Sequence, residues 1–402
     1  MSKSEFPVVV LNAGKEKSAS RNHPWIFSGA IHHVNGEPKS GDTVEVRSAH
    51  GEFLGYAAYS SMSQIRCRLW TFKDRTPIDR EFFSKIIDRA IENRQSRGFD
   101  VHNAKSAFRL INAENDGIPG CIVDKYADIL SIEILSVGAE RFRKTIYELL
   151  VEKVHPRGIL ERCDSDVREK EGLPLRKEAV YGDVPKTPVE MIENGILFNV
   201  DVWNGHKTGY YLDQRDARFN VGKYAKGKHV LNCFSYTGGF GLFALQNGAK
   251  LVTEVDVSKD ALAIADSLIQ KNGFDKANVE LVEADVFAYL RKCRDSRKTF
   301  DLIVLDPPKF IESKSHLEKG ARGYKDINLL ALKLLAPHGM LATFSCSGLM
   351  EMNLFQKIVA DAAIDAHRDV QIIERFGQPA DHPVKTSFPE GQYLKGLLLQ
   401  AD

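Results

Sequence analysis

The hydrophobic and polar positions over residues 8–73 form a series of short alternating runs. Two examples are Thr43–Arg47 and Gln64–Trp70, in which apolar and polar side chains take turns. Such alternation is typical of strands with one buried face. A hairpin turn is expected at Ala49–Glu52, where a glycine interrupts the runs. This first pattern predicts a small β-barrel.

The second pattern, over residues 75–190, mixes helical and strand periodicity. A helix is expected to begin at Thr76–Asp79, because apolar side chains from Phe82 to Ile91 then recur along one stripe. Further strands are expected at 108–112, 121–124, 129–135, 158–162 and 195–202, with a turn at 115–120 and a helix near 139–154. The stretch 163–188 is rich in charge, glycine and proline and is expected to be a loop. These elements predict a compact α+β segment.

The third pattern begins near residue 196 and alternates short, fully apolar runs with helical periodicity. The apolar runs are Val230–Phe234, Leu251–Val255, Val279–Val282, Leu302–Leu305 and Gly339–Phe344. Strands that are apolar throughout and separated by helices indicate a mostly parallel sheet covered on both faces, an α/β domain. The chain is therefore predicted to divide into residues 1–74, 75–190 and 191–402.

Composition narrows the class of protein. The 402 residues are 43% hydrophobic and 27% charged, as in a globular protein with a sizeable core. The six cysteines include no Cys-x-x-Cys pair, so neither a disulfide framework nor a metal site is expected. The chain has no long apolar run and no signal peptide, which predicts a cytoplasmic protein without membrane contact. With a net charge of +1, nucleic-acid binding would need a local basic face.

A glycine-rich segment, Thr237–Gly241, lies between the first apolar strand and the helix that follows it. Asp256, Asp285 and Asp306 then follow the next three strands. Because the carboxyl ends of parallel strands meet at one edge of a sheet, the segment and the three acids are expected along one crevice. Each acid alone could simply cap a helix, but three in register indicate a ligand site. NAD fits less well, since the spacing is not Gly-x-Gly-x-x-Gly.

This set resembles the class I S-adenosylmethionine-dependent methyltransferases. The resemblance implies that Gly238 and Gly239 pass the amino-acid part of the cofactor, that Asp256 binds its ribose and that Asp285 lies near its adenine. It also implies a segment over the cofactor pocket at residues 208–215, although Tyr210 could equally be a core aromatic. The further cofactor-binding residues that the resemblance implies are Tyr211, Gln214, Phe234, Tyr236, Thr237 and Asp306.

One of the six cysteines stands apart. Cys346 follows the fifth strand, so it is expected at the same edge of the sheet as Gly238 and Asp306. The other cysteines, such as Cys67, Cys121, Cys233 and Cys293, are expected to be small buried hydrophobes. A thiolate that adds to C6 of a pyrimidine activates C5 to attack the sulfonium methyl group. Methylation of a base nitrogen needs no such covalent step, and an acid followed by Pro-Pro, as at Asp306, suffices to bind the amine.

Several motifs resemble the bacterial 23S ribosomal RNA large subunit methyltransferase I family, which makes 5-methylcytosine. They are His23–Ala30, Phe53–Tyr56, Gly209–Arg215, Asn232–Phe240, Asp306–Lys309 and Phe344–Ser347, in that order over the whole chain. The resemblance implies an N-terminal PUA domain, a small central α+β domain and a Rossmann-like methyltransferase domain. It also implies that Cys346 is the nucleophile and that Asp306 hydrogen-bonds the cytosine ring edge.

The resemblance leaves some roles open. Pro308 stands where many RNA 5-methylcytosine enzymes have a second cysteine, so the base that removes the C5 proton is unassigned, with Lys309 and Asp306 as candidates. RNA contacts are expected in the PUA-like region, either from stacking side chains or from phosphate-binding cations. Those candidates are Arg21, His23, Trp25, Arg66, Arg68 and Lys73, with Trp25 alternatively a core aromatic.

Three hypotheses about function follow. The first is a 23S rRNA cytosine-C5 methyltransferase that flips its target base out of the stack. The second moves the methyl group to a base nitrogen and uses Asp306-Pro-Pro. The third is a non-catalytic RNA-binding factor for ribosome assembly, which the intact series of acids argues against. The target nucleotide, naked RNA or assembled subunit as substrate, and whether the chain forms a homodimer are all left open.

Overall fold

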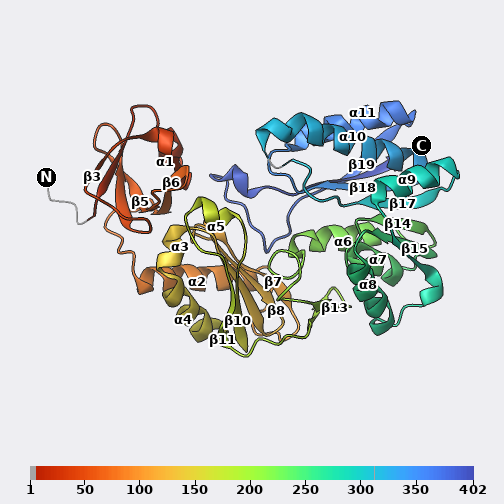
Figure 1. Ribbon diagram of the computed structural model, residues 1–402, viewed down its shortest axis with the longest axis horizontal. Helices are drawn as coiled ribbons and strands as arrows, with labels where there is room; N and C mark the ends of the chain where they lie inside the picture. Colours follow the sequence, from red (N-terminus) through yellow and green to blue (C-terminus); the bar gives the residue numbers. More distant parts are fainter. Residues whose placement is uncertain (1–5, 312) are drawn as a thin grey trace. The chain divides into compact units, whose positions relative to one another are not determined.

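The computed structural model describes residues 6–311 and 313–402, which form two compact units (Figure 1). The N-terminal unit extends to Met191 and also includes Val200–Leu212 and Ala380–Gly391. The C-terminal unit contains Ile192–Asn199, Asp213–Pro379 and Gln392–Asp402. The predicted division into three domains stays a prediction. No helix within the described ranges is long and apolar enough to span a membrane.

The first sheet of the N-terminal unit has six strands in the order β2-β6-β5-β4-β1-β3. Its elements are β1 (Val8–Leu11), α1 (Lys17–Ser20), β2 (Trp25–Phe27), β3 (Ile31–Asn35), β4 (Thr43–Arg47), β5 (Phe53–Tyr59) and β6 (Ile65–Thr71). Val9, Val44 and Cys67 are fully buried in its interior. The alternating runs of the sequence therefore correctly predicted β4 and β6.

The second sheet of this unit has five strands in the order β11-β10-β9-β8-β7. The strands are β7 (Ala107–Asn112), β8 (Cys121–Tyr126), β9 (Ile129–Ile134), β10 (Gly158–Cys163) and β11 (Arg176–Gly182). Helices α2 (Arg80–Gln95), α3 (Val137–Arg141) and α4 (Arg143–Val154) contribute Phe83, Ala139 and Leu149 to its core. Asp79 caps α2, because its carboxylate accepts a hydrogen bond from the backbone N–H of Phe82 at 3.0 Å.

One prediction in this region is wrong. Residues 163–188 are not a continuous loop, because they contain α5 (Val167–Lys170) and β11. Strand β11 pairs antiparallel with β10, and most of its side chains are exposed. An exposed edge strand is held by its backbone ladder rather than by apolar burial, so it leaves no hydrophobic alternation in the sequence.

The C-terminal unit is built on a seven-stranded sheet with the order β16-β15-β14-β17-β18-β20-β19. The parallel strands are β14 (His229–Cys233), β15 (Leu251–Asp256), β16 (Val279–Glu283), β17 (Phe300–Leu305) and β18 (Leu335–Ser345). All five match the apolar runs of the sequence. Two antiparallel strands that were not predicted, β19 (Val370–Phe376) and β20 (Lys395–Ala401), complete the sheet.

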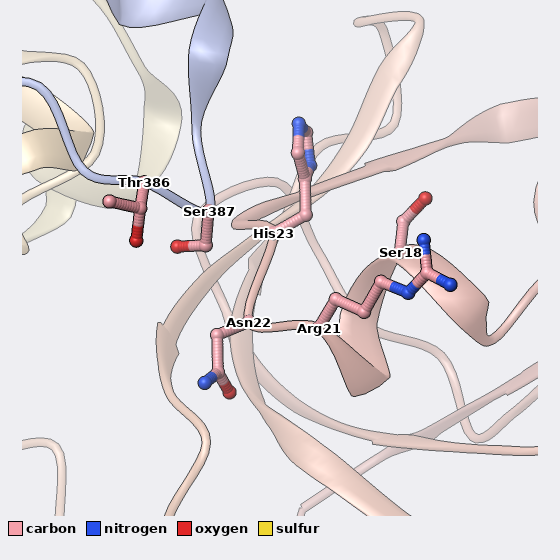
Figure 2. Close-up of a pocket in the computed structure, with 6 residues that line it drawn as sticks. All are labelled: Ser18, Arg21, Asn22, His23, Thr386 and Ser387. Atoms are coloured by element: carbon pink, nitrogen blue, oxygen red, sulfur yellow. The ribbon is translucent and has the colours of Figure 1, made fainter.

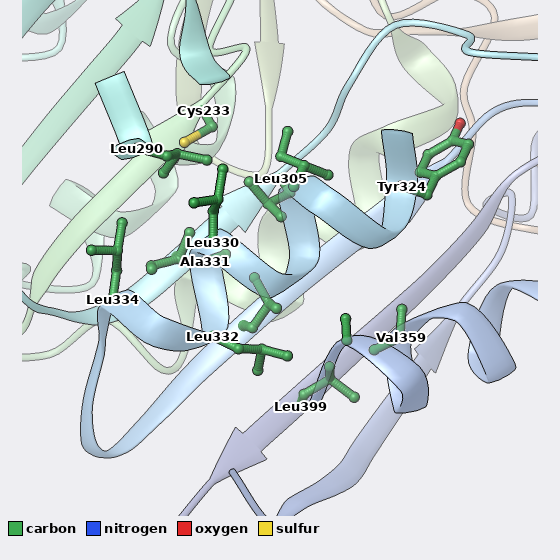
Figure 3. Close-up of a cluster of buried hydrophobic side chains, with 14 of the residues drawn as sticks. Cys233, Leu290, Leu305, Tyr324, Leu330, Ala331, Leu332, Leu334, Val359 and Leu399 are labelled. Carbon is green, nitrogen blue, oxygen red and sulfur yellow. The ribbon is translucent and has the colours of Figure 1, made fainter. Parts of the chain in front are cut away.

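Helices cover both faces of this sheet. They are α6 (Arg215–Gly222), α7 (Gly239–Gln246), α8 (Lys259–Lys271), α9 (Val286–Asp295), α10 (Leu317–Leu334) and α11 (Met352–Ala366). Leu305 and Leu399 pack with α9, α10 and α11 on one face (Figure 3). Val304 and Leu398 pack with α6 and α7 on the other. Burial of each such side chain contributes about 1.5–3 kcal/mol, so the sheet is a rigid base for the loops at its edge.

The order of strands sets the position of the site. From β14 the chain moves outward through β15 to β16, and then returns to the other side of β14 to form β17 and β18. Such a reversal leaves a crevice at the carboxyl ends of the central strands. In register, Cys233 of β14 pairs with Leu305 of β17, and Leu305 pairs with Thr343 of β18. The residues that follow these three positions therefore emerge together at one edge of the sheet.

Candidate active site

The loop between β14 and α7 has an unusual backbone. Phe234 and Tyr236 adopt left-handed conformations with φ of +57° and +50°, and Gly238 follows with φ of +79°. A left-handed conformation costs a non-glycine residue about 1–3 kcal/mol and is concentrated at functional sites. Thr237 is buried within this loop, and α7 begins at Gly239. The predicted cofactor loop is therefore a strained turn at the carboxyl end of the central strand.

A buried acid lies directly beneath the loop. A side chain at Gly241 would place its Cβ 1.6 Å from Oε1 of Glu254, so any other residue there would have to displace this buried acid. Asn232 donates a hydrogen bond from Nδ2 to Oε2 of Glu254 at 2.7 Å. Burial raises the pKa of Glu254 to about 8, opposed by the hydrogen bond from Asn232 and reinforced by the charge of Asp256. Glu254 is therefore mostly neutral at pH 7 and supports the loop from below.

Asp256, at the end of β15, is held by two backbone groups. The N–H of Tyr236 donates to Oδ2 and the N–H of Ser258 donates to Oδ1, each at 2.8 Å. Each carboxylate oxygen still has a lone pair that could accept from a ribose hydroxyl. The next residue, Val257, is 67% exposed and offers an apolar face beside the acid, as a purine ring would need. The sequence analysis did not include Val257 in the cofactor site. Its signal was its position, because it is an apolar residue directly after the acid that was expected to bind ribose.

Asp285 behaves differently from Asp256. It is exposed and caps α9, because Oδ1 accepts a hydrogen bond from the N–H of Ala288 at 2.9 Å. The simpler interpretation, a helix cap, therefore holds for this carboxylate. Its predicted place near adenine stays a prediction. It follows β16, the edge strand of the sheet, in which Glu283 pairs with Asp256.

Asp306 and Gln214 lie in direct contact. Gln214, buried just before α6, donates from Nε2 to Oδ1 of Asp306 at 2.9 Å. The Oε1 atom of Gln214 is buried and has no hydrogen-bond partner among the described residues. A buried carbonyl oxygen is costly to leave unpaired, so this atom suits a donor on a bound ligand, such as an ammonium group. The structure thus brings two predicted site residues together within the C-terminal unit.

Tyr211 is another residue that the sequence predicted for the cofactor site. It belongs to the N-terminal unit, where its hydroxyl lies 2.9 Å from Nδ1 of His206 and its ring lies beneath the Lys207 ammonium at 4.5 Å. Its predicted position over the cofactor pocket stays a prediction. The neighbouring Tyr210 is buried, as a core aromatic would be.

Cys346 directly follows the last residue of β18 and is partly exposed. The other five cysteines are buried, as expected for the four that the sequence assigned to packing. Burial raises the pKa of the Cys67 thiol to about 12 and also raises the pKa values of the remaining four buried thiols. Those thiols are therefore inert at neutral pH, whereas Cys346 is accessible to a reagent or substrate.

Buried hydroxyl groups hold the Cys346 loop. Ser345 donates from Oγ to the hydroxyl oxygen of Tyr324 at 2.9 Å, and the same hydroxyl lies 3.3 Å from Oγ of Ser347. All three side chains are fully buried. The residues on both sides of Cys346 are thus attached to α10, so the sulfur is presented by a fixed turn.

The sequence interpretation also missed Lys395. Its side chain is 3% exposed, and Nζ donates to the carbonyl oxygens of Ser347 at 2.7 Å and Tyr393 at 2.6 Å. Burial lowers the pKa of Lys395 to about 8, while the charge of Cys346 raises it and that of Lys309 lowers it. A lysine beside the apolar run of β20 was the only sequence signal for this residue.

In the PUA-like region, two of the RNA-contact candidates have structural partners. Trp25 donates from Nε1 to Oε1 of Glu114 at 2.7 Å, and its ring packs against Phe388 at 4.7 Å. Arg68 pairs with Glu114 and with Glu171, each at 3.0 Å. Arg68 is therefore part of a nearly buried ion-pair network, and its contact with RNA stays a prediction. The contacts of Trp25 agree with the alternative interpretation, that it is a packed aromatic side chain.

A polar pocket lies beside Arg21 (Figure 2). Its volume is about 450 Å³ and its lining residues are Ser18, Arg21, Asn22, His23, Thr386 and Ser387. Figure 2 shows that they come from α1 and the turn after it, and from the segment Thr386–Ser387 of the same unit. His23 lies 3.0 Å from the carboxylate of Glu390, while Arg21 is exposed. An arginine at the mouth of a polar pocket is suited to bind a phosphate group.

Comparison with known families agrees with this geometry. A family model described as S-adenosylmethionine-dependent methyltransferase matches residues 177–399, and a model described as PUA-like domain matches residues 9–72. A solved structure from Streptococcus mutans, described as a SAM-dependent methyltransferase, aligns with a TM-score of 0.84 at 25% identity, over 98% of this chain and 99% of its own. A second solved methyltransferase, complexed with SAH, shares the fold with a TM-score of 0.85. The chain is an S-adenosylmethionine-dependent methyltransferase.

Curated relatives define the family more closely. Ribosomal RNA large subunit methyltransferase I from Shewanella denitrificans is 51% identical over 391 residues, which are 97% of this chain and 98% of the relative. The protein of the same name from Aeromonas hydrophila is 51% identical over 98% of this chain and 99% of its own. The chain belongs to the ribosomal RNA large subunit methyltransferase I family.

Proposed function

We propose that the protein transfers a methyl group from S-adenosylmethionine to C5 of a cytosine in 23S ribosomal RNA, through a covalent adduct with Cys346. The curated relatives, similar over almost their whole length, carry a name that states a ribosomal RNA substrate. The observation that carries the covalent step is the placement of Cys346. It is the partly exposed cysteine among six, and it follows the parallel strand next to the one that delivers Asp306.

The site residues fit the cofactor. The loop from Phe234 to Gly238 and the open lone pairs of Asp256 suit its amino-acid and ribose parts. The buried Oε1 of Gln214 is an acceptor for its ammonium group. When bound, the cofactor supplies an electrophilic methyl group on a sulfonium sulfur.

The chemistry proceeds in balanced steps. The Cys346 thiolate adds to C6 of the cytosine, which places an electron pair on C5. C5 would take the methyl group as the bond from that carbon to the sulfonium sulfur breaks, which leaves a neutral thioether. A proton acceptor then removes the C5 proton while the bond from the Cys346 sulfur to C6 breaks and regenerates the thiolate. In this proposal Asp306, which accepts a hydrogen bond from Gln214, also accepts one from the ring edge of the cytosine. The target base must leave its stack, because the sulfur approaches C6 from above the ring plane.

Replacement of the nucleophile tests this mechanism. We expect Cys346→Ala to abolish formation of 5-methylcytosine in ribosomal RNA, measured by nucleoside mass spectrometry, while calorimetry still detects binding of S-adenosylmethionine. The matched control is Cys293→Ala, which removes a thiol that is 3% exposed in α9. The control is expected to keep its activity. Methylation by the Cys346→Ala protein at the unmodified rate would disprove the covalent mechanism.

A second candidate function is methylation of a base nitrogen. The contact between Gln214 and Asp306, followed by two prolines, favours it, because such a group could bind an exocyclic amine without a nucleophile. The same mass spectrometry distinguishes the two products, since 5-methylcytosine and an N-methylated base differ in retention and fragmentation. An N-methylated base that is still formed by Cys346→Ala would establish this second function.

A further inference from the structure

Lys395 is a buried cation in an apolar setting. It is the first residue of β20, and Gly396, Leu397, Leu398 and Leu399 after it are buried as well. A charged ammonium group is almost never placed in such an environment unless something compensates for its lost hydration. Its side chain is 3% exposed, so water does not provide that compensation.

The contacts of Lys395 place it behind the loop that carries Cys346. In the sheet, Lys395 pairs with Ser345, the residue before Cys346. Its Nζ atom then donates to the carbonyl oxygen of Ser347, the residue after Cys346, at 2.7 Å, and to that of Tyr393 at 2.6 Å. Lys395 is thus connected to both neighbours of the cysteine, to Ser345 through the strand pairing and to Ser347 through its side chain. An ammonium group has three N–H donors, so these carbonyls use two of them.

The charge of Lys395 has no carboxylate partner. Among the residues that the structure describes, Nζ contacts carbonyl oxygens only. The charged groups that act on it are Cys346, which favours the ammonium form, and Lys309, which opposes it. Burial raises the pKa of the Tyr324 hydroxyl, across the loop on α10, and the charge of Cys346 adds a smaller contribution in the same direction. Of the described residues whose charge acts on this buried cation, Cys346 is therefore the anionic one.

We propose that Lys395 is a positioning residue for Cys346, which fixes the loop through the carbonyl of Ser347 and supplies the positive charge that stabilises the thiolate. This inference rests on the proposed role of Cys346 as the nucleophile. The thiol proton leaves to solvent, and the ammonium group keeps its own three protons. Because Lys395 has a pKa of about 8, it is still mostly charged at pH 7. A cation next to a cysteine is a recognised means of producing a reactive thiolate at neutral pH.

The first measurement needs no substitution. Alkylation of Cys346 by iodoacetamide, followed across pH by peptide mass spectrometry, reports the thiolate fraction directly. We expect the rate of alkylation to reach half of its maximum at a pH below about 8.5, the ordinary pKa of a cysteine thiol. A midpoint at or above that value would overturn the proposal. The buried cysteines react slowly under these conditions, and Cys346→Ser supplies the background.

The second measurement removes the charge. Lys395→Met keeps the length of the side chain but removes its charge. We expect the rate of Cys346 alkylation at pH 7 to fall about tenfold, because a rise of one unit in the pKa of the thiol lowers the thiolate fraction about tenfold. Lys395→Arg should restore part of the reactivity, because it keeps the charge. The matched control is Lys357→Met on the exposed side of α11. An alkylation profile of Lys395→Met that coincides with that of the unmodified protein would also overturn the proposal.

Methylation assays complete the test. We expect Lys395→Met to lower kcat, with an altered pH profile, while calorimetry gives the same affinity for S-adenosylmethionine as before. A purely structural role would change the affinity and the folding as well. The alkylation experiment contains neither RNA nor cofactor, so it tests the role of Lys395 separately from the proposed function. The proposed function is contradicted by a different result, which is methylation by the Cys346→Ala protein.

Discussion

Glu254→Gln is expected to remove a pH dependence from the stability of the C-terminal unit. Glu254 is 2% exposed and accepts a hydrogen bond from Asn232 beneath the cofactor loop. Glutamine has the shape of the protonated acid and can accept the same bond through its carbonyl oxygen. The substitution therefore keeps the neutral form of the side chain at every pH, whereas the natural acid must be held neutral by binding a proton.

The size of the effect follows from the pKa of Glu254. Burial raises it from 4.5 to about 8 in the folded protein. The folded state thus binds this proton more tightly than the unfolded state does. The resulting stabilisation is fully present below about pH 4.5 and is lost as the pH rises through about 8. At 1.36 kcal/mol for each unit, the loss amounts to about 5 kcal/mol between those limits, and the Gln variant should not show it.

Hydrogen exchange is the suitable assay. The three tryptophans, Trp25, Trp70 and Trp203, all lie in the N-terminal unit, so intrinsic tryptophan fluorescence would report on the wrong part of the chain. Exchange of peptides that cover β14 and β15, corrected for intrinsic rates, gives the local free energy of opening at pH 5, 7 and 9. The exposed Glu283→Gln is the matched control. The reasoning would be refuted if the local free energy of opening changed with pH by the same amount in Glu254→Gln and in the natural protein.

Two further predictions concern binding. Gly241→Ala should weaken the binding of S-adenosylmethionine, measured by calorimetry, at least about tenfold. The new Cβ would lie 1.6 Å from Oε1 of the buried Glu254, and relief of this clash would displace the cofactor loop. Arg21→Ala should weaken ribosomal RNA binding several-fold and lower the slope of log affinity against log salt by about one, as expected when one phosphate contact is lost.

Each of these two predictions has a control. Gly377→Ala meets no atom within 4 Å, so it should bind the cofactor like the unmodified protein. Unchanged affinity in Gly241→Ala would show that the loop and the acid beneath it can move apart. For RNA binding, the control is Lys15→Ala, an exposed cation outside the pocket. An equal loss in both variants would mean that general charge, and not the pocket beside Arg21, attracts RNA.

Prediction of the fold from sequence depended on where side chains are buried. Four of the parallel strands of the C-terminal unit, β14, β15, β17 and β18, are largely buried, and each therefore appears as a short apolar run. Strand β11 presents mostly exposed side chains, so the same method took it for loop. Strand β20 is apolar like its neighbours, but its antiparallel pairing with β18 depends on a long connection that local periodicity does not describe.

The candidate site divides in the same way. The sequence by itself determined the glycine loop, Asp256, Asp306 and Cys346, because each stands at the end of an apolar strand, and such ends meet at one edge of a parallel sheet. Only the tertiary structure decided which groups support them. Glu254 under the loop and Lys395 behind Cys346 are reached across strand pairings and through buried contacts. Periodicity is a local property of the chain, whereas these contacts join residues far apart in sequence, so they exist only once the sheet has formed.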